Sequence, residues 1–248
     1  DRYDVLRQYF GYDAFRAGQE PLIEAVCSGR DAVGVMPTGG GKSLCYQVPS
    51  LLLEGVTLVI SPLISLMKDQ VMALCAAGVP AAYLNSSLTA PQQREVCARL
   101  LDGAYRIVYV APERLCAGRF PETAARLRIP LLAVDEAHCI SQWGQDFRPS
   151  YLRIPEFVAS LPRRPVLAAY TATATQQVRE DIERLLELDD PLRIVTGFDR
   201  PNLNFEVLRP ENKTASLLRL VRARRGKSGI VYCATRSGVE RVCRTLCE

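Results

Sequence analysis

The chain has very few of the residues that build metal sites, and no run of residues that could span a membrane. Its 248 residues include a single histidine, so a zinc site made from cysteine and histidine lacks its ligands. Glu54 interrupts the longest apolar run, and none reaches the about 18 residues that a membrane helix needs. The nine cysteines are scattered, which favours reduced intracellular thiols. We therefore predict a cytoplasmic protein with no membrane partner.

Lysine is also scarce, and the net positive charge comes from the end of the chain. Only four lysines are present, and residues 1–198 carry 20 Lys and Arg against 22 Asp and Glu, a balance of −2. Residues 199–248 carry 11 against 5, a balance of +6. The longer region is no general polycation, so any contact with nucleic acid there must come from individually placed groups.

Short, continuously apolar segments alternate with amphipathic ones, which predicts an α/β fold: a parallel sheet with helices on both faces. We expect strands at residues 32–36, 57–60, 81–84, 106–110, 131–134, 166–170 and 193–196. We expect helices at residues 44–53, 63–76, 90–101 and 174–186. Five of the loops that follow strands contain glycine or polar residues. Because parallel strands end at the same edge of a sheet, these loops predict one shared active face.

Turn-forming residues around Pro201 interrupt this pattern. They predict a first domain at 1–197, an interdomain link at 198–210 and the beginning of a second domain at 211–248. In the second domain we expect a helix at 215–225, a strand at 229–233 and a helix starting at 237. About 45 residues bury too little surface for an α/β core, so we expect this second domain to be incomplete.

The segment 37–43 ends like a phosphate-binding loop (P-loop). Glycines allow backbone N–H groups to converge on phosphates, Lys42 would reach the terminal phosphates, and the Ser43 hydroxyl would bind Mg²⁺. The strict pattern has glycine where Met36 stands, which leaves a flexible turn as the alternative. The nucleotide-binding candidates here are Thr38, Gly39, Gly40, Gly41, Lys42 and Ser43.

Two adjacent carboxylates follow the predicted strand at 131–134. Asp135 would hold Mg²⁺, largely through water, and Glu136 would orient or deprotonate an attacking water. The alternative is a helix N-terminus, where acidic residues are favoured. With the P-loop, the pair predicts ATP and Mg²⁺ as cofactors. It also gives Lys42, Asp135 and Glu136 as catalytic candidates.

Four motifs together resemble the superfamily 2 helicases, which have two RecA-like lobes. They are Asp-Glu-Ala-His at 135–138, the P-loop, the segment 61–70 and Thr-Ala-Thr at 171–173. The run Ala-His-Cys-Ile-Ser-Gln-Trp-Gly at 137–144, continued by Asp-Phe-Arg-Pro at 146–149, resembles the RecQ family of DNA helicases. So does the segment from Phe10 to Gln19. The resemblance implies that the chain holds a first RecA-like lobe and the start of a second.

The resemblance also implies roles for single residues. Tyr12, Arg16 and Gln19 would hold adenine, although Gln19 by itself reads as an ordinary surface residue. The implied contacts with DNA, and the residues that couple DNA to ATP, are Ser61, Lys68, Arg114, Gln142, Trp143, Phe147, Arg148, Thr171 and Thr173. For Lys68 a solvated helix position is the alternative, and for Trp143 a side chain packed under its loop. Gln145 departs from the family, which usually has histidine there, and this departure bears on the coupling of DNA binding to hydrolysis.

The implied function is an ATP-dependent 3′–5′ DNA helicase motor, acting as a monomer on single-stranded and partially duplex DNA in repair and recombination. The rest of the second lobe would supply an arginine to the γ-phosphate. Such an arginine is worth about 10³–10⁵ in rate, so we expect this chain to bind ATP weakly and hydrolyse it poorly. Two alternatives remain: an RNA helicase of the same superfamily, and a binding protein that does not hydrolyse ATP.

Overall fold

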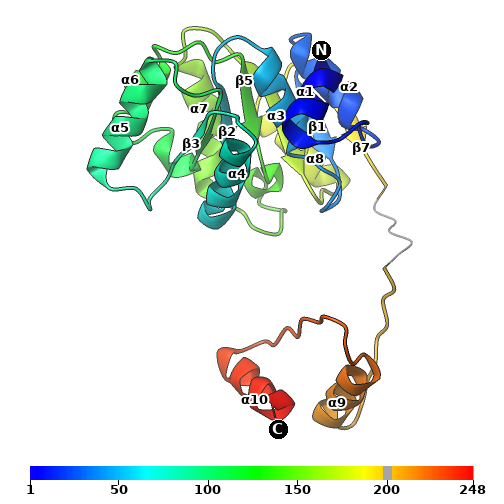
Figure 1. The fold of residues 1–248 in the computed structure, drawn as a ribbon. Coiled ribbons are helices and arrows are strands. Elements are labelled where there is room, and N and C mark those ends of the chain that lie inside the picture. The colour runs from blue at the N-terminus through cyan, green and yellow to red at the C-terminus, as the bar shows by residue number, and fades with distance from the viewer. Residues whose placement is uncertain (198–202, 248) are drawn as a thin grey trace. The chain divides into compact units, whose positions relative to one another are not determined.

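The computed structural model describes residues 1–197 and 203–247, which fall into two compact units (Figure 1). Unit 1 is Asp1–Phe198 and unit 2 is Asp199–Glu248. Residues 198–202 of the predicted link lie outside the described residues. No described helix combines the length and the hydropathy that crossing a membrane requires.

Unit 1 contains a sheet of seven strands, all parallel, in the order β3-β4-β2-β5-β6-β1-β7. The strands are β1 (Ala32–Val35), β2 (Thr57–Ile60), β3 (Ala81–Leu84), β4 (Ile107–Val110), β5 (Leu131–Val134), β6 (Val166–Thr171) and β7 (Leu192–Val195). The predicted parallel sheet is confirmed, and each predicted strand end lies within one residue of the observed one.

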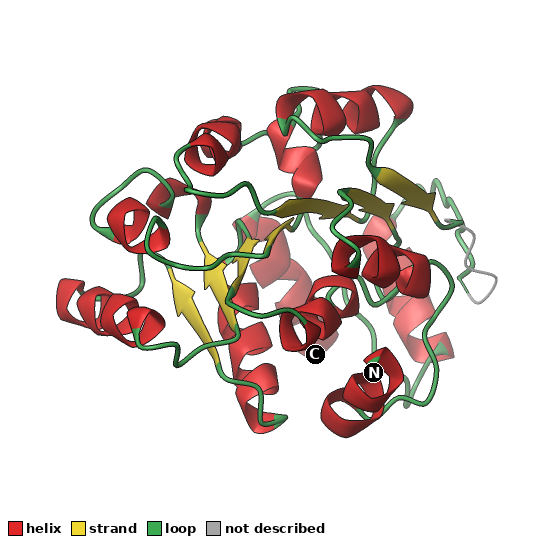
Figure 2. Ribbon diagram, turned by 90° about the horizontal axis from the view of Figure 1, so that it is seen from above, coloured by secondary structure: helices red, strands yellow, loops and turns green. Residues whose placement is uncertain are grey.

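Helices cover both faces of this sheet (Figure 2). One face packs against α1 (Arg2–Phe10), α2 (Gln19–Cys27), α3 (Leu44–Leu52) and α4 (Ile64–Ala76). The other packs against α5 (Ala90–Leu101), α6 (Phe120–Ala124), α7 (Ile154–Ala159) and α8 (Gln176–Leu185). Short 3₁₀ helices occur at η1 (Pro112–Arg114), η2 (Ala137–Ile140) and η3 (Pro149–Arg153). The helix predicted from residue 174 begins later because the Thr175 side chain caps it, accepting a hydrogen bond from the N–H of Val178.

Alternate residues of β1 to β6 enter two different hydrophobic cores. In β1, Val33 and Val35 face the core beneath α5–α8, whereas Ala32 faces the core beneath α1–α4. In β2, Leu58 and Ile60 face the first core and Val59 the second. Burial on both faces therefore explains why these strands are continuously apolar.

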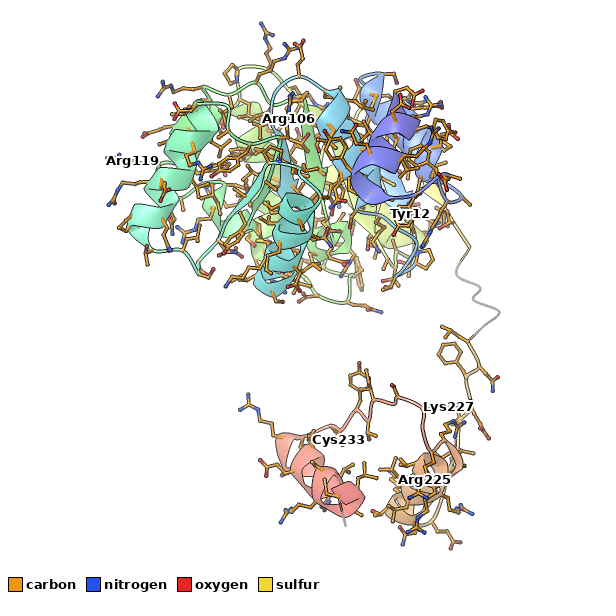
Figure 3. All side chains as sticks on the ribbon, in the orientation of Figure 1. Tyr12, Arg106, Arg119, Arg225, Lys227 and Cys233 are labelled. Carbon is orange, nitrogen blue, oxygen red and sulfur yellow. The ribbon has the colours of Figure 1, made fainter. Side chains whose placement is uncertain are left out.

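Unit 2 contains two helices, α9 (Lys213–Ala223) and α10 (Arg236–Cys247), close to the predicted positions. The prediction of a strand at 229–233 was wrong, because these residues form no strand. Ile230 and Tyr232 are instead 79% and 90% exposed. A strand requires hydrogen bonds to a neighbouring strand, and the described residues of unit 2 contain none. The segment between α9 and α10 contains Arg225, Lys227 and Cys233 (Figure 3).

Candidate nucleotide and nucleic-acid site

The sheet order brings three predicted motifs to one edge. β6 lies between β1 and β5, so Thr171 at its end stands between the P-loop and Asp135. The N–H of Met36 donates to the carbonyl of Thr171 at 3.0 Å, and the N–H of Asp135 donates to the carbonyl of Ile60 at 2.8 Å. The loops that follow these strands are therefore held in register by backbone hydrogen bonds.

The P-loop turns sharply between β1 and α3. Gly39 and Gly41 have φ angles of +83° and +78°, a left-handed conformation that favours glycine. A Cβ atom on Gly41 would also collide with the side-chain amide of Gln19. Lys42 lies across the turn, with Nζ donating to the carbonyl of Met36 at 3.2 Å. The backbone conformation thus favours glycine at residue 41, and a side chain there would displace the Gln19 amide from its hydrogen bond.

Gln19 ties the segment before α2 to the P-loop. Its side chain is only 1% exposed, which corrects its reading as an ordinary surface residue. Its Oε1 accepts from the N–H of Arg16 at 2.7 Å, and its Nε2 donates to the carbonyl of Gly41 at 2.9 Å. The Arg16 guanidinium donates to the carbonyl of Gly39. The segment expected to hold adenine and the loop expected to hold phosphates are therefore joined by hydrogen bonds from both Arg16 and Gln19.

These residues line one cleft of about 530 Å³. Tyr12, which is 49% exposed, lies on its rim just beyond the end of α1 (Figure 3). Of the predicted nucleotide-binding and catalytic residues, the cleft contacts Tyr12, Arg16, Gln19, Thr38, Gly39, Gly41, Lys42, Ser43, Asp135 and Glu136. Gly40 alone is outside the lining. A single cavity thus brings together residues that are up to 124 positions apart in the chain.

Asp135 is a buried carboxylate at this cleft, 6% exposed. Burial, followed by the neighbouring charge of Glu136, raises its pKa to about 6. No cationic side chain of the described residues lies within ion-pair distance of it. Such a carboxylate suits a cation, and Ser43 supplies a second oxygen to the same cleft. Because Mg²⁺ keeps water and phosphate ligands, these two donors fit it without a cage built from protein alone.

Glu136 follows Asp135 in a left-handed conformation, with φ of +48°, which costs a non-glycine residue backbone energy. His138 Nδ1 lies 3.3 Å from its Oε2 and 2.9 Å from Oγ1 of Thr171. The hydrogen bond to His138 lowers the pKa of Glu136. Hydrogen bonds to the Cys139 sulfur and to Glu136 raise the pKa of His138. At neutral pH the Glu136 carboxylate is thus ionised beside a protonated imidazole, which also reaches Thr171.

The residues expected to contact the DNA backbone differ in exposure. Ser61 is 1% exposed, and its hydroxyl has no hydrogen-bond partner among the described residues. The prediction of a direct DNA contact by Ser61 therefore does not fit this structure, because the side chain points into the packed interior. Lys68 on α4 and Arg114 on η1 are half-buried and reach the surface. Thr173 is exposed, whereas Thr171 is buried.

Trp143 lies on the loop 141–148 after η2, and we call this segment the aromatic loop. The indole is 76% exposed, which rules out a tryptophan packed under the loop. Gln142 and Gln145 are also exposed, and Phe147 is half-buried. Arg148 bonds to the Asp146 carboxylate at 2.8 Å and donates to the carbonyl of Pro62 at 3.0 Å. Arg148 therefore connects the aromatic loop to the turn after β2, while the indole stays free at the surface.

Comparison with known proteins identifies the family. The sequence model of the DEAD/DEAH box helicases matches residues 16–182, two thirds of the chain. The chain belongs to the DEAD/DEAH box helicase family. It is 47% identical over 98% of its length to the ATP-dependent DNA helicase RecQ of Pasteurella multocida, and 48% identical over 96% to that of Bacillus subtilis. These matches confirm the resemblance to the RecQ family. The chain covers 38% and 40% of those relatives.

Solved helicase structures share this fold. The DUF1998 helicase MrfA superposes with a TM-score of 0.74 at 22% identity, covering 98% of this chain and 40% of MrfA. MrfA bound to DNA and AMPPNP superposes with a TM-score of 0.75 at 19% identity, covering 99% of this chain and 37% of that one. The RecA-like architecture expected from the sequence is therefore confirmed for this helicase chain.

Several side chains around this cleft were not predicted from the sequence. The Tyr151 hydroxyl is buried and donates to the carbonyl of Asp135 at 2.8 Å. Gln47 lines the cleft and donates both to Gln70 at 2.8 Å and to the hydroxyl of Tyr109 at 3.1 Å. No local pattern marks these residues, because their partners come from other elements of the fold. The one signal in the sequence was a glutamine within each of two largely apolar segments, Gln47 in α3 and Gln70 in α4.

Proposed function

We propose that this chain is the N-terminal motor region of an ATP-dependent DNA helicase. One observation carries the proposal: a single cleft contains the P-loop, the adenine-segment residues, Asp135 and Glu136. The hydrogen bond between His138 and Thr171 connects the Asp135–Glu136 segment to the Thr171–Thr173 turn, toward the loops that would meet DNA. The names of the bacterial relatives, ATP-dependent DNA helicases, support the same activity.

The cleft suggests how ATP is held and attacked. Tyr12 on the rim would stack on adenine, while Arg16 and Gln19 would position the base against the P-loop. Lys42 would contact the β- and γ-phosphates, and Ser43 and Asp135 would hold Mg²⁺. When bound, Mg²⁺ supplies positive charge that neutralises the phosphates. The Glu136 carboxylate, kept ionised beside His138, would orient the attacking water and accept its proton.

The same edge of the sheet would hold single-stranded DNA. The exposed Trp143 offers a face on which any base can stack, and the half-buried Phe147 belongs to the same aromatic loop. Lys68, Arg114 and Gln142 would contact the backbone, and Arg148 would link these contacts to the turn after β2. Thr171 and Thr173 would couple the two sites through His138. In the complete enzyme we propose 3′–5′ translocation and unwinding by a monomer, in DNA repair and recombination.

Lys42→Ala tests the nucleotide site, with Lys68→Ala as a matched control. Loss of a charge-assisted contact with phosphate should weaken MgATP binding about 10-fold or more. Lys68→Ala should leave this affinity unchanged, because Lys68 does not line the cleft. Isothermal titration calorimetry with MgATP measures both. Unchanged ATP affinity in Lys42→Ala would contradict the P-loop assignment.

The lone tryptophan tests the nucleic-acid site. We expect Trp143 fluorescence to change on titration with single-stranded DNA, and to change less with matched RNA or blunt duplex. An equal response to RNA would favour an RNA helicase. If the fluorescence changes with none of these three nucleic acids, Trp143 no longer supports a motor that acts on single-stranded nucleic acid. ATP binding without any hydrolysis stimulated by DNA, in a longer protein containing both lobes, would favour the non-hydrolysing alternative.

A further inference from the structure

A buried carboxylate joins α8 to the aromatic loop. Asp181 on α8 is 6% exposed and Ser141, at the start of the loop, is fully buried. The Ser141 hydroxyl donates to Oδ2 of Asp181 at 2.7 Å, across 40 positions of sequence. The catalytic scheme proposed above uses neither residue.

The position of Asp181 on its helix is unusual for a carboxylate. It lies beside Val178 and Ile182, which pack into the core, on the buried side of α8. Burying a charge there is unfavourable unless it is paired and hydrogen-bonded. Both oxygens are engaged, since Oδ1 accepts from Arg184 at 2.8 Å. The hydrogen bond from Ser141 lowers the pKa of Asp181, so the carboxylate is ionised at neutral pH.

Ser141 connects the Asp181 carboxylate to the backbone of Trp143. Its Oγ accepts from the N–H of Trp143 at 3.1 Å while donating to Asp181. Its carbonyl accepts from the N–H of Gly144 at 3.0 Å, which closes the turn that presents the indole. A side chain on Gly144 would collide with the carbonyl of His138, so this turn lies tightly against η2. Among the contacts of the aromatic loop, Ser141 is therefore the one whose side chain binds the backbone N–H of the exposed Trp143.

The N-terminal end of α8 follows directly after the Thr171–Thr173 turn. Thr175 caps the helix two residues after Thr173, and Asp181 lies less than two turns further on. We propose that Asp181 is a positioning residue: through Ser141 it holds the backbone of Trp143, and through α8 it links the aromatic loop to the Thr171–Thr173 turn. This route adds to the direct hydrogen bond between His138 and Thr171. Its consequence for DNA rests on the proposed function, whereas the positioning of Trp143 does not.

The first test needs no DNA and uses the single tryptophan of the whole chain. Asp181→Ala should lower the fluorescence anisotropy of Trp143, because the loop backbone loses its anchor. Asp181→Asn should restore most of it, because an amide oxygen still accepts from Ser141. Glu183→Gln is the control: it weakens an ion pair of the same helix with Arg193, away from the loop. Equal anisotropy in Asp181→Ala and Glu183→Gln would overturn the proposal.

Ser141→Ala provides an independent variant if Asp181→Ala fails to fold, as judged by circular dichroism. It removes the same hydrogen bond from the other side and leaves a small buried side chain that the core accommodates. We expect the same loss of Trp143 anisotropy. Retention of the wild-type anisotropy in a folded Ser141→Ala chain would also overturn the proposal.

The second test separates positioning from general destabilisation. Asp181→Ala should weaken binding of a single-stranded oligonucleotide about 10-fold, with MgATP affinity unchanged. Equal losses of both affinities would show a structural role only and would overturn the link to DNA. If the wild-type chain does not bind the oligonucleotide, the proposed function fails. The anisotropy comparison still decides whether Asp181 positions Trp143.

Discussion

Units 1 and 2 contain similar apolar segments that reach opposite structural outcomes. Ile60 ends β2, between β4 and β5, and is fully buried. Ile230 lies in an equally apolar segment of unit 2 but belongs to no strand and is 79% exposed. The composition of the segments does not explain this difference. A strand requires hydrogen-bonding neighbours and covering helices, which only unit 1 supplies among the described residues.

Helices form in both units because their backbone hydrogen bonds are local. α9 is capped by Asn212, whose side chain accepts from the N–H of Ala215, much as Thr175 caps α8. Within unit 2, however, the described helices bury no large apolar side chain. Local signals are therefore enough for a helix, whereas a core requires the rest of a fold.

The largest effect should come from a matched pair of isoleucines. Ile60→Ala leaves a cavity in a packed core and should lower the free energy of unfolding by about 2–5 kcal/mol. Ile230→Ala should change it by less than about 0.5 kcal/mol, because its side chain is already exposed. Urea unfolding followed by circular dichroism measures both. Similar losses would contradict the contrast between the units and show that Ile230 is buried in solution.

Asp135→Asn should raise the free energy of unfolding at alkaline pH while removing a proposed Mg²⁺ ligand. Since burial raises the pKa of Asp135 to about 6, the folded chain keeps a proton that the unfolded chain loses above about pH 4. The free energy of unfolding therefore falls as pH rises from about 4 to 6. Without Mg²⁺, Asp135→Asn should be more stable than wild type by about 1–3 kcal/mol at pH 8, and nearly equal at pH 4. A difference that does not depend on pH, in urea titrations at both values, would contradict this.

Trp143 in unit 1 and the basic segment that follows α9 in unit 2 should contribute differently to DNA binding. Trp143→Ala should weaken binding of a single strand by about 1–3 kcal/mol and leave its salt dependence unchanged, because stacking releases no counterions. The double variant Arg225→Gln, Lys227→Gln should reduce the slope of log K against log salt by about 0.7 for each phosphate that is no longer neutralised. Titrations at several salt concentrations separate the two. A reduced slope in Trp143→Ala would contradict the assignment of stacking.

The smallest effect concerns Glu187, the second residue after α8. Glu187 has φ of +54°, a left-handed conformation at a position where glycine is favoured after a helix. Glu187→Gly should raise the free energy of unfolding by about 0.5–1 kcal/mol, because the backbone strain is relieved. Glu156→Gly, within α7, is the control and should lower the free energy by about as much. Thermal melts resolve both signs, and a lower melting temperature for Glu187→Gly would contradict the strain.

Local pattern in the sequence was enough to predict the elements and motifs of unit 1. Period, turn residues and apolar runs predicted its seven strands and the loops at one sheet edge. They also marked the P-loop and the Asp135–Glu136 pair, because glycines and carboxylates have chemistry that is visible in isolation.

Which residues meet was settled by the packing of the whole fold. The strand order placed Thr171 between the P-loop and Asp135, burial turned Gln19 inward and removed Ser61 from the surface, and packing brought Asp181 to Ser141. These outcomes depend on neighbours far away in the chain, which no local pattern specifies. The segment at 229–233 shows the same limit, since β propensity becomes a strand only where another strand can pair with it.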